Sequence, residues 1–195
     1  MPGLDKRAFG PAGWGMGKVY DRIIPELQAW LGRQHMFTVA TAPLTAEGHV
    51  NCSPKGGDTF RVLGPREVAY ADLTGSGIET VAHLRENGRI VLMFCAYEGA
   101  PQIVRLHGRG EVVEPGDAGF EELRAHFPAL VGLRTIIRVR VTRIADSCGF
   151  AVPRYDFVAP RDVLDRYSEK LGPAGLAEYR AKKNRTSIDG LPGLS

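Results

Sequence analysis

The stretch from Tyr70 to Leu84 (YADLTGSGIETVAHL) combines the residue types that can hold a phosphate group. An apolar segment leads through the turn Gly75–Gly77 into a helical pattern. A helix start flanked by glycines presents free backbone N–H groups and the positive end of the helix dipole. Thr74, Ser76 and Thr80 can each add a hydroxyl donor. These features together suit an anion at the start of the helix.

The same turn also has a purely structural interpretation. Ser76 followed by Glu79 predicts a capping box, in which each side chain accepts a hydrogen bond from the other residue's backbone. The apolar residues Ile78, Val81 and Leu84 would let this helix form without any ligand. Local sequence alone favours the cap, because the Glu79 carboxylate would repel a phosphate unless the cap held it. A Walker loop is excluded, since no Gly-Lys-Ser/Thr follows at the required spacing.

Two further groups of residues could do chemistry. His107 lies between Arg105 and Arg109 on the polar face of a strictly alternating strand, although a solvated strand face explains the same pattern. The segment Ser53-Pro54-Lys55-Gly56 ends another strand, where an ordinary turn with a surface lysine is the simpler interpretation. The histidines and cysteines show no metal-ligand spacing, so no metal site is expected.

The periodicity of apolar residues predicts a mainly β protein with a few helices. Strands are expected at residues 35–41, in a segment ending at 51–56, and at 67–71, 89–94, 103–113 and 135–143. Helices are expected from Asp21 to about Gln34, after the glycine turn as far as Asn87, and around 118–126. Six strands with so few helices between them favour a small antiparallel barrel over a doubly wound sheet. Val139 and Val141 should point into its core.

The chain divides into three parts by composition. Residues 1–19 are rich in Gly and Pro and are expected to form an irregular arm, and residues 20–145 form the barrel. Residues 146–195 are expected to be a helical extension, with short helices at 161–170 and 174–183 separated by Gly172-Pro173. This extension would pack on the barrel or on a second subunit.

Bulk composition limits the class of protein. With 195 residues, 44% hydrophobic and 24% charged, the chain is of the soluble globular type. A net charge of +3 from scattered basic residues does not favour nucleic acid, and no apolar run is long enough to cross a membrane. Three widely separated cysteines, none at an activating spacing, indicate a reducing cytoplasm rather than a disulfide framework.

Three blocks in order resemble the pyridoxamine 5′-phosphate oxidase-like superfamily of flavin-binding split barrels. They are NCSPKGGD (51–58), VAYADLTGSGIETVAHLRENGRIVLMF (68–94) and VRLHGRG (104–110), and the resemblance covers about residues 20–145. It implies a six-stranded antiparallel split β-barrel and a homodimer that shares a cleft for FMN. The C-terminal segment resembles that of an uncharacterised bacterial branch.

The resemblance also implies which residues bind the cofactor. Those near the phosphate would be Thr74, Ser76, Gly77 and Thr80, and those beside the isoalloxazine ring would be Ser53 and Lys55; Arg105 and His107 complete the candidate set. A lysine beside the ring would stabilise the negative charge of a reduced flavin. No residue of the set is assigned as catalytic, because a flavin supplies the redox chemistry itself.

The expected activity is an FMN-dependent oxidoreductase that passes a hydride to or from a small organic substrate. True pyridoxamine phosphate oxidases carry an Arg-Lys pair about where Glu79-Thr80 stands here, and an arginine-rich C-terminal segment that this chain lacks. Vitamin B6 oxidation is therefore not expected. Two alternatives remain open: a reductase of the same fold that uses a deazaflavin coenzyme, and a flavin-binding or sensing module without turnover. Some relatives bind haem.

Overall fold

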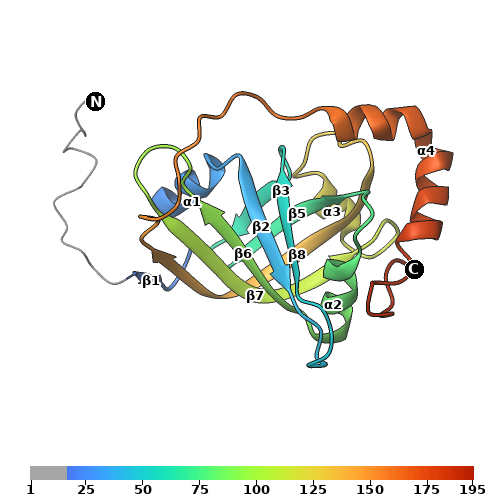
Figure 1. Ribbon diagram of the computed structural model, residues 1–195, viewed down its shortest axis with the longest axis horizontal. Coiled ribbons are helices and arrows are strands. Elements are labelled where there is room, and N and C mark those ends of the chain that lie inside the picture. The colour runs from blue at the N-terminus through green and yellow to red at the C-terminus, as the bar shows by residue number, and fades with distance from the viewer. Residues whose placement is uncertain (1–16) are drawn as a thin grey trace.

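A computed structural model of the chain describes residues 17–195. Its strands are β1 (Val19–Tyr20), β2 (Met36–Thr41), β3 (Asn51–Gly56), β4 (Phe60–Gly64), β5 (Glu67–Leu73), β6 (Arg89–Cys95), β7 (Ile103–Val113) and β8 (Leu133–Ser147). Its helices are α1 (Pro25–Gly32), α2 (Glu79–Asn87), α3 (Phe120–Arg124) and α4 (Val163–Lys183) (Figure 1). The expected arm lies almost wholly outside the described residues, but Val19 and Tyr20 pair with β8.

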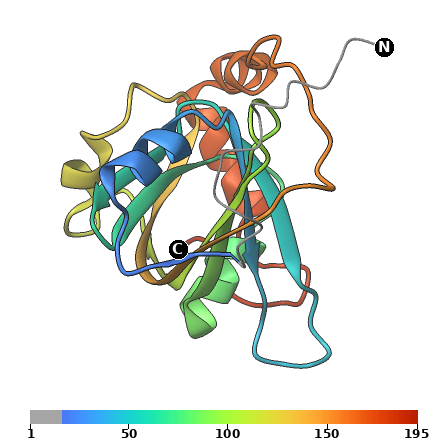
Figure 2. The same ribbon diagram turned by 90° about the vertical axis from the view of Figure 1, so that its left-hand side faces the viewer.

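The strands form one antiparallel sheet in the order β3-β2-β6-β7-β8-β5-β4, with β1 paired to β8. Figure 2 shows the sheet curling into a partly open barrel. The prediction of a mainly antiparallel split barrel is confirmed. The structure adds the short strands β1 and β4 to the six expected. β4 pairs with β5 through a register shift near Gly64, and this short, irregular strand gives only a weak signal in the sequence.

The longest strands, β7 and β8, supply the centre of the core. Their inward positions include Val104, Leu106, Val139 and Val141, all of which are buried, so the expected orientation of Val139 and Val141 is confirmed. Gly108 continues the inward row of β7, where a Cβ would lie 2.4 Å from the carbonyl oxygen of Arg140. Only glycine permits the two strands to approach this closely.

The helices begin and end mostly where their sequence signals place them. Pro25 occupies the first turn of α1, where its missing N–H costs no hydrogen bond. Gly88 ends α2 in the left-handed region at φ 68°, and its N–H donates to the carbonyl of Leu84.

The predicted capping box at the start of α2 is wrong. The residue at the cap position is Ile78, and no side chain caps the helix. Ser76 lies two residues further out and is exposed. The Glu79 carboxylate instead accepts a hydrogen bond of 3.3 Å from the backbone N–H of Ile188. The C-terminal segment has therefore taken the acceptor that the cap needed.

The C-terminal segment wraps around the barrel. Residues 148–162 run over the start of β2, where Phe157 stacks on His35 at 3.6 Å between ring centroids, and lead to α4 (Figure 1). Gly172 interrupts α4 with φ 62° and ψ 178°, so two helical pieces flank Gly172-Pro173 as expected. The chain then turns back, and Leu194 joins the hydrophobic core. Among residues 17–195, no helix has both the length and the apolar character needed to span a bilayer.

The close contact at Gly108 leads to a stability prediction. Gly108→Ala should lower the free energy of unfolding by about 1–3 kcal/mol, because the new methyl group collides with the β8 backbone. The control is Gly32→Ala at the end of α1, where a Cβ meets no atom within 4 Å and stability should hold or rise slightly. Urea unfolding of both variants makes the comparison, and equal losses would contradict the proposed collision.

Candidate functional site

Polar side chains follow the inner face of β3, which is an edge strand of the sheet. Asn51, Ser53 and Lys55 alternate with the exposed residues Cys52 and Pro54. Pairing with β2 places this row beside the inward-facing residues of the neighbouring strand. The row therefore faces the opening of the split barrel instead of the bulk solvent.

Lys55 crosses that opening to a carboxylate on β5. Its Nζ donates to Asp72 Oδ1 at 2.9 Å, while the other carboxylate oxygen accepts from Arg134 Nε of β8 at 2.7 Å. Asp72 is fully buried and Arg134 is only 5% exposed, whereas Lys55 keeps part of its surface open. Burial raises the pKa of Asp72, but the charges of Lys55 and Arg134 and their hydrogen bonds outweigh it and hold that pKa below its ordinary value.

Arg134 also fixes the glycine turn that precedes α2. Its Nη1 donates to the carbonyl of Gly75 at 3.0 Å and its Nη2 donates to the carbonyl of Gly77 at 2.7 Å. The amide of Asn184 donates to the same Gly75 carbonyl at 2.9 Å. The turn therefore points its carbonyls inward, and its backbone N–H groups from Gly75 to Gly77 have no acceptor among residues 17–195.

Thr74, Ser76 and Gly77 were all expected near a phosphate, but the surroundings of Thr74 differ from those of Ser76 and Gly77. Thr74 is buried, donates its hydroxyl to the Gly132 carbonyl at 2.7 Å and accepts from Arg180 Nε at 2.9 Å. Ser76 and Gly77 are exposed at the tip. Ser76 and Gly77 are therefore accessible to a ligand, whereas the Thr74 side chain is committed to the protein.

A hydrogen-bonded network joins β3 to the first turn of α2. Asn51 Nδ2 donates to Thr80 Oγ1 at 2.9 Å and to Thr41 Oγ1 at 3.2 Å, and Thr41 contacts His83 Nδ1 at 2.9 Å. Thr80 accepts in this network and is only 7% exposed, so its own hydroxyl hydrogen can go to one further acceptor, either the neighbouring Tyr70 hydroxyl or a ligand. Burial lowers the pKa of His83 despite the nearby carboxylates, which favours the neutral ring.

Ser53 is the unsatisfied member of the β3 row. Its Oγ is buried and has no hydrogen-bond partner in the described part of the chain. A buried hydroxyl without a partner is unfavourable, so the Ser53 hydroxyl is available to bond a ligand. The hydroxyls of Ser53 and Thr80, the ammonium of Lys55 and the free N–H groups of the turn form a donor set that fits a phosphorylated flavin.

Arg105 and His107 lie on the other face of the sheet. His107 pairs with Val91 in β6, on the outer side of the strands, and Arg105 Nη1 donates to Ser147 Oγ at 2.9 Å. Partial burial, then the charges of Arg143 and Arg105, lower the pKa of His107. Within one subunit these two residues are therefore separated from the Ser53–Lys55 row.

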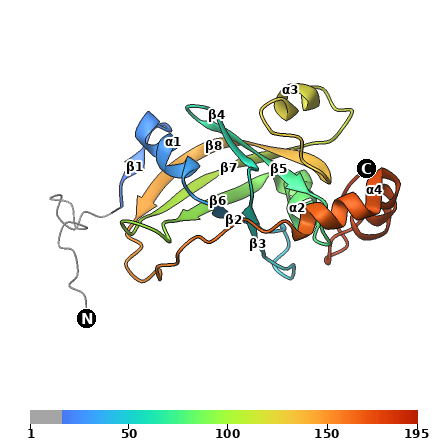
Figure 3. The ribbon, with the colours of Figure 1, turned by 90° about the horizontal axis from the view of Figure 1, so that it is seen from above.

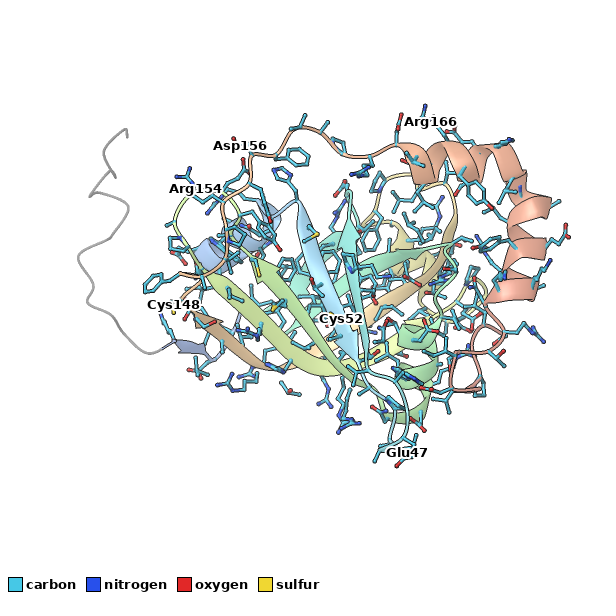
Figure 4. All side chains as sticks on the ribbon, in the orientation of Figure 1. Glu47, Cys52, Cys148, Arg154, Asp156 and Arg166 are labelled. Atoms are coloured by element: carbon cyan, nitrogen blue, oxygen red, sulfur yellow. The ribbon has the colours of Figure 1, made fainter. Side chains whose placement is uncertain are left out.

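Cysteines and metal ligands do not form a second centre within residues 17–195. No three His, Cys, Asp or Glu side chains there gather as a metal site would require. All three thiols are free, and burial raises the pKa of Cys95. Figure 4 shows Cys52 on the strands at the front and Cys148 at the far end of β8.

Sequence reasoning missed three residues that hold the site together, namely Asp72, Arg134 and Asn51. A signal existed for the first two. Asp72 interrupts an otherwise apolar strand, and Arg134 precedes the apolar run of β8. A charge in a buried strand needs a partner of opposite sign, so two such residues predict an internal ion pair.

The Asp72 ion pairs predict how stability depends on pH. Asp72→Asn should cost about 3–5 kcal/mol near pH 7, because it leaves two cations without their shared carboxylate. The pKa of Asp72 is lower in the folded state than in the unfolded chain. Its contribution to stability is therefore complete above the unfolded pKa and is lost as pH falls through the folded pKa, so the stabilities of parent and variant should converge in acid.

The control for this prediction is Asp162→Asn, which breaks an ion pair with Arg166 whose side chains are 69% and 68% exposed. Such a pair is worth about 1 kcal/mol or less, so its loss should hardly change stability. Urea unfolding over a pH series makes both measurements. A parent–variant gap at Asp72 that stays constant into acid would overturn the assignment.

Comparison with known proteins gives the family. The family described as "Pyridoxamine 5'-phosphate oxidase" matches residues 23–148. The pyridoxamine 5'-phosphate oxidase family protein ustO of Aspergillus flavus is 39% identical over 193 residues, which is 90% of this chain and 77% of that protein.

The fold is similar to that in the crystal structure of a putative pyridoxamine 5'-phosphate oxidase from Lactobacillus delbrueckii. It is 16% identical, with a TM-score of 0.51, and the match covers 67% of this chain and 98% of the other. At that identity the likeness concerns the fold alone. The family match and the fungal relative carry the assignment: the chain belongs to the pyridoxamine 5'-phosphate oxidase family.

Proposed function

We propose that this protein binds FMN along the inner face of β3 and at the turn before α2, and that it is an FMN-dependent oxidoreductase. The observation that carries the proposal is the buried, unpartnered hydroxyl of Ser53, in one row with Lys55 and opposite the start of α2. Membership of the family and the resemblance of the same sequence blocks to flavin-binding split barrels support it.

The phosphate end of the cofactor would lie at the turn. Backbone N–H groups of residues 75–77, the exposed Ser76 hydroxyl and the Thr80 hydroxyl are the donors available there. Arg134 and Asn184 hold the turn by its carbonyls, so these N–H groups are fixed before a ligand arrives. Preorganised donors lose little entropy on binding, which favours affinity. Thr74 would support the turn from behind.

The ring end would lie beside Ser53 and Lys55. A bound flavin supplies the capacity to accept or give a hydride. The ammonium of Lys55 would stabilise negative charge on a reduced ring, and the Ser53 hydroxyl would donate to a ring heteroatom. Asp72 holds Lys55 in place and offsets part of its charge. Lys55 would therefore be an oriented donor whose positive charge is partly offset by Asp72.

Two alternatives remain beside this function. Glu79 and Thr80 offer no cation at the start of α2, which keeps a deazaflavin coenzyme in consideration and disfavours vitamin B6 oxidation. A flavin-binding module without turnover would use the same donors. The visible absorption spectrum of protein purified without added cofactor distinguishes a bound flavin from a deazaflavin coenzyme. A flavin band supports the proposal, and a colourless protein that takes up only the deazaflavin would replace it.

We propose a homodimer with a shared cleft, which the positions of the candidate residues support. Arg105 and His107 lie on the outer face, so they can reach a flavin held at Ser53 and Lys55 only if it belongs to a second copy.

The phosphate assignment predicts a difference between two ligands. Thr80→Ala should weaken FMN binding by about 1–3 kcal/mol, because a hydrogen bond to a charged oxygen is lost. Riboflavin lacks the phosphate, so its affinity should hardly change. Thr80→Ser keeps the hydroxyl and should retain FMN affinity. Flavin fluorescence titration measures all three. Equal losses for both flavins, or none for either, would place the phosphate elsewhere.

The dimer proposal predicts the mass in solution. Sedimentation equilibrium at micromolar concentration should give twice the chain mass of 21.2 kDa. Arg105→Glu should weaken association or flavin binding, because it reverses a charge that the second subunit would present to the ligand. A protein that sediments only as a monomer and still binds FMN would contradict the shared cleft.

A further inference from the structure

A cavity lies away from the β3 row, between α4 and the segment that leads into β8. Its volume is about 440 Å³, within the range of small-molecule sites. Figure 3 shows α4 at the same end of the barrel as α2. The lining residues come from both sides of the bend in α4 and from the loop before β8: Val131, Gly132, Ser168, Glu169, Gly172, Pro173, Leu176 and Arg180.

Arg180 brings a positive charge to this cavity without a compensating carboxylate. Its Nε donates to Thr74 Oγ1, and its Nη2 donates to the carbonyls of Leu133 at 3.0 Å and Gly132 at 3.5 Å, all uncharged acceptors. Among residues 17–195 no acidic side chain lies within ion-pair distance of it, and Nη1 has no acceptor there. Burial and then the charge of Arg134 lower the pKa of Arg180, and no carboxylate effect opposes them.

Ser168 contributes an unsatisfied hydroxyl on the same wall. Its side chain is 1% exposed, and its Oγ has no hydrogen-bond partner in the described part of the chain. Gly132 adopts φ 82°, and a Cβ at that position would lie 2.7 Å from Ser168 Oγ. The glycine therefore lets helix and loop approach closely and leaves the hydroxyl beside the cavity.

The remaining walls favour an apolar ligand body with one negative charge. Val131, Pro173 and Leu176 provide apolar surface, and Gly172 opens the bend that separates the two helical pieces. Glu169 is exposed at the rim and would repel a doubly charged group such as phosphate more than a single carboxylate. Arg180 with its planar guanidinium suits a carboxylate.

We propose that this cavity binds a small organic monocarboxylate, with the carboxylate at Arg180 and Ser168 and the apolar body against Val131, Pro173 and Leu176. The proposal does not rest on flavin binding. Arg180 also holds Thr74 at the turn before α2, so an occupant of this cavity would contact the same arginine that supports the proposed phosphate site.

The probe for this site is 3-phenylpropanoate, with 3-phenylpropylamine and 3-phenylpropan-1-ol as controls of the same shape. Isothermal titration should detect the carboxylate and give at least about tenfold weaker binding for the amine and the alcohol. Inorganic phosphate should not compete. Binding of all three compounds with similar affinity, or of none up to about 10 mM, would overturn the proposal.

Variants locate the binding. Val131→Trp should abolish it by filling the cavity from a residue that is 37% exposed, so folding should be preserved. The matched control is Val163→Trp, an exposed position on α4 that does not line the cavity, where binding should be unchanged. Arg180→Gln should weaken the carboxylate at least tenfold and leave the alcohol unchanged.

Glu169→Gln should tighten binding of the carboxylate severalfold, because one repulsive charge at the rim is removed. Carboxylate binding that survives in Val131→Trp would place the site elsewhere and overturn the proposal. Failure of the flavin titrations would leave these measurements unaffected, so the two proposals fail separately.

Discussion

The buried carboxylate of Asp72 is the interaction on which the rest of the site depends. It lies on β5, but it binds a lysine from the edge strand β3 and an arginine from β8. Two charges brought into a protein interior cost several kcal/mol unless their geometry is good, and here one carboxylate satisfies two cations, one through each oxygen. This arrangement holds β3 across the open side of the barrel, where no backbone ladder joins it to β5.

The same ion pairs extend to the turn before α2. Arg134 donates to the carbonyls of Gly75 and Gly77 while Asp72 binds its Nε, so Asp72 helps to orient the guanidinium toward the turn. The orientation of those carbonyls decides that the N–H groups of the turn face outward. The two ends of the proposed flavin site are therefore set by one anchor, and a change at Asp72 would disturb both together.

The sequence predicted most of the fold because its signals are local. Strict alternation in residues 103–113 and 135–143 located β7 and β8, and glycine after Asn87 located the end of α2. The capping box failed for a reason that local sequence does not contain. The backbone of Ile188 lies more than a hundred positions away in the chain, and it binds the carboxylate that the cap would have used.

The site was predictable in its parts but not in its arrangement. A family resemblance pointed to Ser53, Lys55 and the turn, and alternation placed Ser53 and Lys55 on one face of β3. Alternation could not predict that Lys55 pairs with Asp72, because strand order in the sheet does not follow from periodicity. The same alternation rule, applied through the register with β6, separates His107 from that face.

Three cations in this region, Lys55, Arg134 and Arg180, have one buried carboxylate among them. Asp72 pairs with Lys55 and Arg134, and of the three only Arg180 has no acidic partner among residues 17–195. An excess of positive charge held by fixed hydrogen bonds attracts anionic ligands without further rearrangement, so one charge imbalance favours an anion on either side of Thr74.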